Sequence, residues 1–555
     1  MNYYEYLGGG IKKNMWTVFR HNGPYFPQEY VSHGINVLIN NKETKLPLLA
    51  EEYATLYARY LGTPYLENSL FNKNFWKDFK ETLPKELNIE NLEDIDFSPI
   101  KKYLENEKEK RNHMSKEEKL KISLQNKEIE EPYKFCFIDG GKQKVGNYRI
   151  EPPGIFMGRG THPKIGSIKK RIQPEDVTIN IDKESEPPKP NIQGHKWGKV
   201  IHDKTVVWLA TWKDGVTGKN KYIFTSVESI FKSKSDEKKF DLAKRLKRKV
   251  RAIREEYESH LKDDDLKKKQ LATALYFTDH FALRVGGKKD TKKKADTVGV
   301  TSLRVEHIEL VPPNIIKLDF LGKDSIRYCK RTSVISEVYG NLELFTRGKD
   351  KKEQLFNLVN SSVLNDYLDS FMKGLTAKVF RTYNASNLFQ KELDKIKEEK
   401  INKIDESERL NYLISLFNQA NTEVALLCNH QKAVSGNLEE QLKKFDDRIK
   451  KYKKIKKKLL DLYTTKKTNK DKRKVRNKID KADAKIKLLK LKKDTKSKMK
   501  NVSLGTSKNN YIDPRIVFAF IKRFNISEEN QEKIMPKKLI ERFDWASSVD
   551  KNYRF

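Results

Sequence analysis

Residues 438–460 read LEEQLKKFDDRIKKYKKIKKKLL, and residues 475–489 read VRNKIDKADAKIKLL. Apolar residues recur at helical steps in the first segment, at Leu438, Leu442, Phe445, Ile449, Tyr452 and Leu459. The second segment repeats the pattern at Val475, Ile479, Ala482, Ile486 and Leu489. Such spacing gathers the apolar side chains on one stripe of each helix. The pattern predicts an antiparallel coiled-coil hairpin around the break TTKKTNK, with a disordered basic spacer as the alternative.

The predicted hairpin carries much of the positive charge of the chain. Residues 437–500 contain 27 Lys and Arg and 9 Asp and Glu, a net charge of +18 out of +37 for all 555 residues. A chain this basic repels itself unless it meets a polyanion, so nucleic acid is the expected partner. An anionic membrane is the competitor, but no apolar run is long enough to span one, and the start MNYYEYLGGGIKKNMW resembles neither a signal nor a transit peptide. We therefore expect a soluble, intracellular protein.

The three cysteines, Cys136, Cys329 and Cys428, are scattered without CxxC spacing. This arrangement supports neither a zinc site nor a disulfide framework. Buried free thiols are the expected state.

After the hairpin, residues 507–520 read SKNNYIDPRIVFAF. Asp513 is suited to cap a helix, and Pro514 suits its first turn because the missing N–H would have no helical partner there. Tyr511, just before this helix start, is a packing residue on the simplest interpretation. A nucleophilic role requires partners elsewhere in the chain.

Before the hairpin, the pattern predicts an α+β fold. Up to about residue 215, turn signals alternate with short strands such as TVVWLATW and KYIFTSV, and residues 115–135 form a charged helix that ends at Pro132. From about Lys238 an amphipathic helix follows, with the apolar stripe Leu242, Leu246, Val250, Ile253, Tyr257 and Leu261. Residues 298–311 are predicted as a strand, followed by a β-hairpin around LGKDS, and helices resume from about Glu353 to Cys428.

A tyrosine that attacks a phosphodiester needs cations to stabilise the charge on the phosphoryl oxygens and an acid to protonate the leaving alkoxide. Arginine suits the first task and lysine can serve as the acid. Four local patterns offer such groups: FALRVGG with Arg284, GKDS with Lys323, TAKVFRTYNAS with Lys378 and Arg381, and LLCNHQ with His430. Taken singly, each is equally consistent with a surface charge or, for His430, a helix C-terminal cap.

Taken together and in this order, these residues and Tyr511 resemble the eukaryotic DNA topoisomerase I family of the type IB class. The resemblance runs essentially from end to end, through GPYFP, MSKEEKLKI, EPPGIFMGRGTHPKIG, ADTVGVTSLRVEHIEL, LDFLGKDSIRY and LGTSKNNYIDPR. It implies that Tyr511 is the nucleophile, forming a 3′-phosphotyrosine link and freeing a 5′-hydroxyl. By the same resemblance, Arg284, Arg381 and His430 hold the scissile phosphate, and Lys323 protonates the leaving 5′-oxygen.

The resemblance also implies DNA contacts at Arg159, His162, Lys164, Asp324, Lys378 and Asn510. Arg159 matches a contact near the break, where camptothecin-like intercalators lodge in this family. Met157 stands where many relatives have a basic residue, so one backbone contact of the family has no counterpart here. For His162 and Lys164, an ordinary proline-containing surface turn is the alternative.

The architecture implied by the family is a bilobed clamp around duplex DNA. Its expected parts are an α+β cap at 1–230, a mostly helical catalytic domain at 231–435, a coiled-coil linker at 436–500 and a small helical C-terminal domain at 501–555. The expected activity relaxes supercoils of either sign without ATP, metal ion or other cofactor, in support of replication and transcription. We expect a monomer whose partner is double-stranded DNA, with the hairpin lying near the DNA downstream of the nick and slowing its rotation.

A nuclear location is expected from the family. Relatives usually carry a long charged N-terminal tail with nuclear targeting sequences, and this sequence begins almost at the expected folded core. Import is therefore expected to use internal basic clusters such as KKYKKIKKK or DKRKVR.

Three other interpretations were weighed. A tyrosine recombinase shares the Arg, Lys, Arg, His, Tyr chemistry, but usually has HxxR where this chain has Lys378 and Arg381, and it lacks the cap motifs. A non-catalytic chromatin or nucleic-acid-binding protein would use only the basic surface. A type IA topoisomerase needs an acidic metal-binding cluster, and the sequence shows no DxD-type triad.

Overall fold

The computed structural model describes residues 14–291, 294–402, 404, 406–431, 437–466, 468–498 and 500–555. Contacts divide the chain into two compact units. The N-terminal unit runs up to Lys232 and includes Lys289–Asp296, and the C-terminal unit comprises Ser233–Lys288 and Thr297–Phe555. The domain boundary expected near residue 435 lies outside the described residues. No helix among the described residues is long and apolar enough to cross a membrane.

The N-terminal unit combines short strands with four α-helices among its described residues. The helices are α1 (Leu48–Ala58), α2 (Ser69–Lys80), α3 (Ser98–His113) and α4 (Lys116–Glu130). The strands are β1 (Phe19–His21), β2 (Val37–Ile39), β3 (Lys42–Thr44), β4 (Ile95–Asp96), β5 (Phe135–Ile138), β6 (Gly141–Lys144), β7 (Gly154–Ile155), β8 (Ile168–Lys169), β9 (Thr178–Asn180), β10 (Lys199–Ile201), β11 (Trp208–Lys213) and β12 (Asn220–Phe224). They form small sheets with the orders β1-β5-β6, β3-β2-β4, β7-β8 and β10-β9-β11-β12.

Two apolar cores stabilise this unit. One surrounds α1 and α2 and contains Phe71, Phe75 and Phe79, all fully buried on one face of α2. The other lies against the sheets and contains Trp16, Phe19, Phe26, Ile179 and Trp212. The charged helix predicted before Pro132 is confirmed as α4, and its start is fixed by a capping box between Ser115 and Glu118.

The C-terminal unit is mostly helical. Its helices are α5 (Ile230–His260, entering from the N-terminal unit), α6 (Leu266–His280), α7 (Ser336–Thr346), α8 (Ser361–Phe371), α9 (Ala377–Asp394), α10 (Glu398–Asn402), α11 (Glu406–Leu427), α12 (Leu438–Thr465), α13 (Asn469–Lys498), α14 (Leu504–Asn510), α15 (Pro514–Arg523), α16 (Glu528–Gln531) and α17 (Lys537–Arg542). One antiparallel sheet joins β13 (Ile308–Val311), β14 (Ile315–Leu321) and β15 (Arg327–Ser333).

A single large core holds this unit together and reaches from α5 to the last residue of the chain. The apolar stripe predicted on α5 faces this core, with Leu246, Val250, Ile253 and Tyr257 buried and Leu242 partly buried. Helices α9, α11 and α15 contribute Phe389, Phe417 and Phe520 to the same core. The segment after the hairpin is therefore packed into the same body as the helices that precede it.

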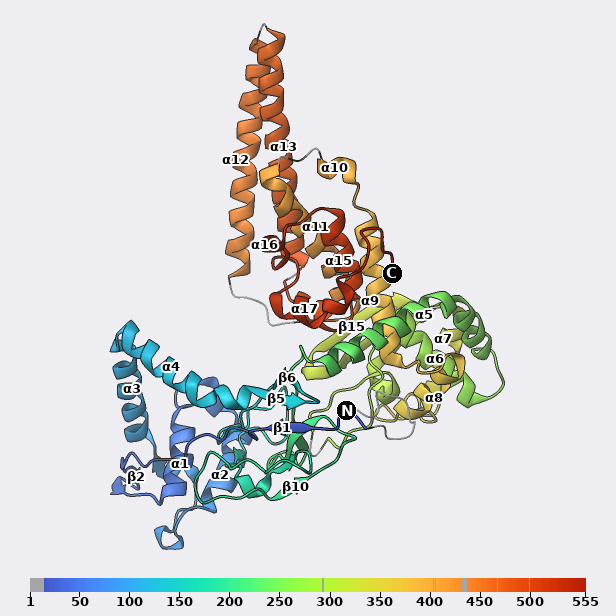
Figure 1. Cartoon of the computed structure of the whole chain (residues 1–555). Helices are drawn as coiled ribbons and strands as arrows, with labels where there is room; N and C mark the ends of the chain where they lie inside the picture. The colour runs from blue at the N-terminus through green and yellow to red at the C-terminus, as the bar shows by residue number, and fades with distance from the viewer. Residues whose placement is uncertain are drawn as a thin grey trace. The chain divides into compact units, whose positions relative to one another are not determined.

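The two helices predicted for the basic stretch are confirmed as α12 and α13, which lie side by side in Figure 1. Val475, Ile479, Ala482, Ile486 and Leu489 are all buried, as the stripe predicts. Lys493 pairs with Asp446, whereas Lys456 pairs with Asp483. Because the partner on α13 moves backward as position on α12 moves forward, the helices are antiparallel.

Helix α13 also packs along α11, which anchors the hairpin to the rest of the C-terminal unit. Two ion pairs cross this contact, Lys485 with Glu408 and Lys498 with Glu423. The base of the hairpin is closed by a β-bridge between Gln431 and Val502. The hairpin thus returns the chain to its starting point beside α11.

Two expectations about the region between α6 and α9 were wrong. Residues 298–311 were expected as a β segment, but Val300–Ser302 and Val305–His307 form 3₁₀ turns, and of these residues only Ile308–Val311 forms a strand. Here the Arg304 N–H bonds to the ring of His307, and Val305 bonds to the carbonyl of Glu353, so these backbone groups are not free for a ladder. Helices also resume at α7, well before the expected Glu353.

We predict that Leu489→Ala opens the hairpin locally. Leu489 is 2% exposed in the α12–α13 contact, so truncation should cost about 2–4 kcal/mol of local stability. Amide hydrogen exchange in α12 and α13 should then accelerate by about thirtyfold or more while α9 is unchanged. Leu460→Ala is the matched control because Leu460 is 44% exposed. Equal exchange in the two variants would contradict the packing described.

Candidate active site

Arg284 lies in a loop that follows α6, four residues past the helix end. The loop is held by two backbone bonds, from Val300 N–H to the Arg284 carbonyl and from Thr301 N–H to the Val285 carbonyl, both 2.8 Å. Gly286 and Gly299 make this close approach possible, because a Cβ on Gly299 would lie 2.5 Å from the Arg284 oxygen. Gly286 and Gly299 therefore fix the backbone from which the Arg284 side chain projects.

Lys323 and Asp324 occupy the turn between β14 and β15, as the sequence predicts. The turn is closed by a bond of 2.8 Å from Gly322 N–H to the Ile326 carbonyl. Asp324 and Ser325 both have left-handed backbone conformations, with φ of 67° and 58°. Non-glycine residues adopt this conformation at a cost, which is found most often at functional sites. The turn presents Lys323 and Asp324 as exposed side chains.

Arg381 and Lys378 lie on α9, one turn apart. Arg381 is 3% exposed and donates to the Cys428 carbonyl at 3.0 Å. Its Nε is buried and has no hydrogen-bond partner among the described residues. Partial desolvation lowers the pKa of Lys378, Asp236 opposes this shift, and the positive charge of Lys323 adds to it. The positive charge of Lys323 therefore acts on the Lys378 ammonium.

His430 follows α11 and is 4% exposed. Asn429 takes a left-handed conformation, φ 52°, and turns the chain so that the His430 N–H bonds to the Ala425 carbonyl at 2.8 Å. The His430 carbonyl accepts a bond of 2.7 Å from Ser503, which comes from the far side of the hairpin. Its ring Nδ1 lies 2.8 Å from the Ser507 hydroxyl. The backbone on both sides of the hairpin thus holds this histidine.

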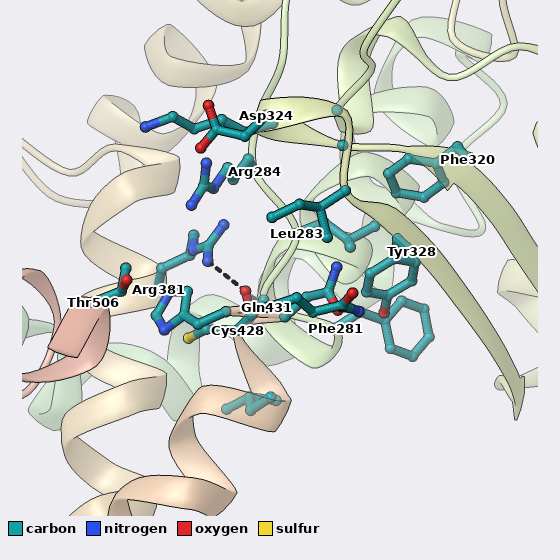
Figure 2. A pocket seen from close by; sticks show the side chains of 18 of the residues that line it. Phe281, Leu283, Arg284, Phe320, Asp324, Tyr328, Arg381, Cys428, Gln431 and Thr506 are labelled. Carbon is teal, nitrogen blue, oxygen red and sulfur yellow. Dashed lines mark hydrogen bonds between the residues drawn. The ribbon is translucent and has the colours of Figure 1, made fainter. Parts of the chain in front are cut away.

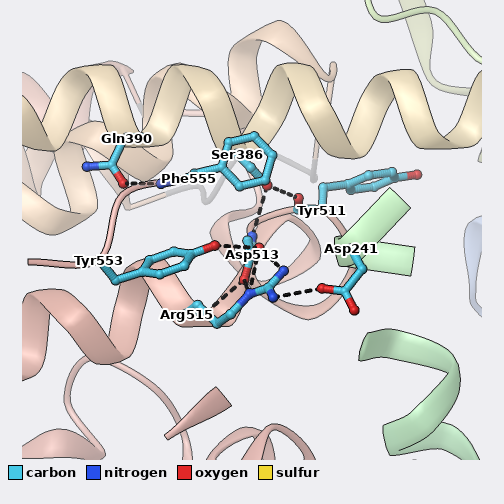
Figure 3. A network of polar contacts seen from close by, with 8 residues as sticks. All are labelled: Asp241, Ser386, Gln390, Tyr511, Asp513, Arg515, Tyr553 and Phe555. Atoms are coloured by element: carbon cyan, nitrogen blue, oxygen red, sulfur yellow. Dashed lines mark hydrogen bonds and ion pairs between the residues drawn. The ribbon is translucent and has the colours of Figure 1, made fainter. Parts of the chain in front are cut away.

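Tyr511 follows α14 and is 9% exposed. Its ring stacks on the His430 ring, with centroids 5.2 Å apart, and the Arg381 guanidinium carbon lies 4.9 Å from its centroid. The Tyr511 carbonyl accepts a bond of 3.0 Å from Ser386 on α9. Figure 3 shows the ring extending away from the network of Ser386, Asp513 and Arg515. The expected nucleophile therefore contacts two of its expected phosphate ligands.

Asp513 has the capping role predicted for it. Its carboxylate is fully buried, accepts from the Arg515 N–H at 2.9 Å and pairs with the Arg515 side chain (Figure 3). The Asp513 N–H donates to the Ser386 hydroxyl at 3.0 Å. The same serine therefore binds the backbone on both sides of Ile512.

A pocket of about 210 Å³ brings together four of the five predicted catalytic residues. It is lined by residues 281–284, 322–324, 326, 328 and 427–431, with Arg381, Val298, Gly299, Phe320 and Thr506. Figure 2 shows the guanidinium groups of Arg284 and Arg381 facing the same space, with Asp324 beside them. Tyr511 is not among the described lining residues, but its ring packs against Arg381 and His430, which line the pocket.

The electrostatics of the pocket favour an anion. Burial and the charge of Arg381 lower the pKa of Arg284. Burial, followed by the charges of Arg381 and Arg284, lowers the pKa of His430 to about 3. The His430 ring is therefore neutral, and its buried Nε2 has no hydrogen-bond partner among the described residues. Two buried nitrogens in a cationic pocket match the non-bridging oxygens of a phosphodiester.

The other predicted DNA contacts lie in two places. Asn510 is exposed at the end of α14, and its carbonyl accepts a bond of 3.1 Å from Lys239. Arg159, His162 and Lys164 lie in the N-terminal unit, in a loop with left-handed Gly158 and Gly160. Arg159 is exposed, whereas the His162 ring packs on Phe156 and the Lys164 ammonium bonds to the Val216 carbonyl. The contacts of His162 and Lys164 are those of an ordered turn, which was the alternative interpretation of these two residues.

Sequence reasoning missed Ser507, Ser386 and the Cys428 carbonyl, which position the predicted residues. Ser507 stands four residues before Tyr511 on a short helix, a spacing that could have indicated a shared face. Ser386 lies five residues after Arg381 on α9, a spacing that indicates no shared face. The Cys428 contact is made through its backbone, so no side-chain pattern could reveal it.

Comparison with known proteins identifies the family to which the chain belongs. Residues 14–225 match the model "Eukaryotic DNA topoisomerase I, DNA binding fragment" and residues 228–462 match "Eukaryotic DNA topoisomerase I, catalytic core". Residues 483–555 match a C-terminal topoisomerase domain. The chain is 43% identical to DNA topoisomerase 1 of Caenorhabditis elegans, over 98% of this chain and 68% of the relative.

The chain belongs to the eukaryotic DNA topoisomerase I family. It is 39% identical to human DNA topoisomerase 1, over 98% of this chain and 72% of the human protein. It is 40% identical to DNA topoisomerase 1 beta of Arabidopsis thaliana, over 99% of this chain and 60% of that relative. Membership of the topoisomerase I family makes the chain a type I DNA topoisomerase, an isomerase with DNA as its partner.

We predict that His430 makes folding stability more sensitive to acid. Because burial depresses its pKa to about 3, the unfolded chain binds a proton below about pH 6.5 that the folded chain does not bind. Lowering the pH from 7 to 5 should therefore destabilise the native chain by about 2 kcal/mol more than His430→Gln. Urea unfolding followed by circular dichroism measures this difference. His113→Gln, at an exposed histidine, is the control, and parallel pH dependences for His430→Gln and the native chain would contradict the prediction.

Proposed function

We propose that this chain relaxes positive and negative supercoils by cutting one DNA strand through Tyr511, allowing rotation and resealing the strand. One observation carries the proposal: Arg381 and His430 each contact the Tyr511 ring, and each has a buried nitrogen without a hydrogen-bond partner among the described residues, beside the same cationic pocket. A phosphodiester held in that pocket would be bound by the groups that also position the nucleophile.

In the cleavage step, the Tyr511 phenolic oxygen attacks the phosphorus and the bond to the 5′-oxygen breaks. The phenolic proton passes to solvent, and the Lys323 ammonium protonates the departing 5′-oxygen. Arg284, Arg381 and His430 donate to the non-bridging oxygens, where negative charge develops. Lys323 suits the acid role because it lies on an exposed turn that lines the pocket, where its side chain has room to reach a bound phosphate.

Resealing reverses these steps, with the 5′-hydroxyl attacking the phosphotyrosine. One phosphodiester replaces another, so the cycle conserves bond energy and needs no ATP. The aliphatic alkoxide is a poorer leaving group than the phenolate, so the acid matters more for cleavage than for resealing. Three cationic side chains line the pocket, and we propose that they supply the charge stabilisation without a metal ion.

We propose that residues of both units bind the DNA. We propose that Arg159, His162 and Lys164 in the N-terminal unit and Asp324, Lys378 and Asn510 in the C-terminal unit contact the duplex near the cleavage site. The basic hairpin would lie along the DNA downstream of the nick, where its net charge of +18 over residues 437–500 is matched by phosphates. We propose that this activity supports replication and transcription, and we therefore expect the protein in the nucleus.

Tyr511→Phe should abolish relaxation while leaving DNA binding intact. The loss of the attacking oxygen should lower the relaxation rate by on the order of a thousandfold or more. The measurement is relaxation of positively and negatively supercoiled plasmid in EDTA without ATP, together with detection of the covalent adduct. Tyr553→Phe is the control, since Tyr553 lies in the same C-terminal segment and its hydroxyl contacts Asp513 at 3.5 Å. Tight binding without any relaxation by the native chain would instead indicate a DNA-binding protein.

Lys323→Ala should slow cleavage of an ordinary phosphodiester by about a hundredfold to ten-thousandfold. A duplex with sulfur in place of the bridging 5′-oxygen should be cleaved by the variant within about tenfold of the native rate, because a thiolate leaves without protonation. Lys330→Ala is the control, because Lys330 packs over Phe281 and does not line the described pocket. An equal defect on both substrates would exclude Lys323 as the acid.

A further inference from the structure

Ser507 contacts both the His430 ring and the backbone of Tyr511, and it is fully buried. Its hydroxyl oxygen is 2.8 Å from Nδ1 of His430. Its carbonyl accepts the N–H groups of Tyr511 and Ile512, at 2.9 and 3.0 Å. One residue of α14 therefore contacts one side-chain ligand of the pocket and the backbone of the nucleophile.

The direction of the Ser507–His430 bond follows from the proton on the serine. A buried hydroxyl needs an acceptor for its proton. Among the described residues, Nδ1 of His430 is the partner within hydrogen-bond distance of the Ser507 hydroxyl. The hydroxyl therefore donates and Nδ1 accepts. A neutral imidazole that accepts at Nδ1 carries its hydrogen on Nε2.

The neutral form of His430 follows from the groups around the ring. Arg381 of α9 and Arg284 of the loop after α6 are positive, Tyr511 stacks on one face, and burial desolvates the ring. Among the described residues, no carboxylate contributes to the pKa shift of this ring. A second proton on the imidazole would add a like charge to this environment, so Nδ1 stays free to accept.

We propose that Ser507 is a positioning residue that holds His430 in the tautomer with hydrogen on Nε2, so that the ring donates to one non-bridging oxygen of the scissile phosphate. In the other tautomer Nε2 would present a lone pair, which repels a phosphate oxygen. Nε2 is the buried atom that has no partner among the described residues, and His430 lines the pocket. This inference rests on the proposed function, because it assigns the means by which His430 holds the phosphate.

Ser507→Ala tests the hydroxyl while retaining the backbone bonds that position Tyr511. In single-turnover cleavage of a suicide duplex, we expect this variant to be about tenfold slower than the native chain, which corresponds to one hydrogen bond. Ser507→Thr, which keeps a hydroxyl, should stay within about threefold. Ser415→Ala is the matched control, because Ser415 is also a buried helical serine and donates to the Asn411 carbonyl. The double variant Ser507→Ala, His430→Ala should be no slower than His430→Ala.

Methylphosphonate substrates distinguish a positioning role of Ser507 from a general loss of structure at the site. Each of the two diastereomers replaces one non-bridging oxygen at the scissile phosphate with a methyl group. For the diastereomer that lacks the oxygen bound by Nε2, Ser507→Ala and the native chain should cleave at the same rate. For the other diastereomer, the tenfold difference should persist. His430→Ala should show the same selectivity for one diastereomer.

An equal Ser507→Ala defect on all three substrates, or a defect that adds to that of His430→Ala, would overturn the positioning role while the proposed function stands. Failure of the native chain to form any covalent adduct would overturn both. If Ser507→Ala does not fold, Ser507→Cys replaces it in the same comparison, because a thiol has a similar size and is a weaker donor.

Discussion

The Ser386 hydroxyl joins the two parts of the site. It donates to the Tyr511 carbonyl and accepts from the Asp513 N–H, and so ties the segment that follows the hairpin to α9 (Figure 3). The chain that connects His430 to Tyr511 runs out along α12 and back along α13, so covalent connection does little to place the tyrosine. Its position depends on contacts such as these, on the Ser503 bond to His430 and on the shared core. Since α9 also carries Arg381, one helix positions both Tyr511, the proposed nucleophile, and Arg381, a proposed phosphate ligand.

The same arrangement concentrates positive charge that the described residues only partly compensate. Burial and the nearby charge of Arg381 lower the pKa of Arg284, and burial together with the charges of both arginines keeps His430 neutral. Holding like charges together at a buried position costs folding free energy. A bound phosphate would offset that cost, and donors that are already oriented need not reorganise when charge develops during reaction. We therefore expect that the site favours anion binding and that it lowers the stability of the free protein.

Local backbone geometry also fixes the positions of Arg284 and Lys323, which line the same pocket. The Gly286 and Gly299 contact fixes the loop of Arg284, and the left-handed residues Asp324 and Ser325 shape the turn that presents Lys323. These features come from different elements of the C-terminal unit and converge on one pocket. Helices and strands thus form the rigid part of the site, and two short irregular segments, the loop of Arg284 and the turn of Lys323, carry side chains that line the pocket.

The sequence by itself determined the family, the hairpin helices, the Asp513 cap, the turn of Lys323 and the residue types of the site. Each is encoded locally, by helical spacing, capping residues or turn residues, or by motifs that stand in a recognisable order. It misassigned residues 298–311, because the bonds from Arg304 to His307 and from Val305 to Glu353 depend on neighbours that a local pattern does not show. Tertiary structure alone decided that Ser507 contacts His430, that the Cys428 carbonyl binds Arg381 and that the Tyr511 ring stacks on His430. Those contacts join residues 47 to 81 positions apart, and only the packing of the C-terminal unit in one core brings them together.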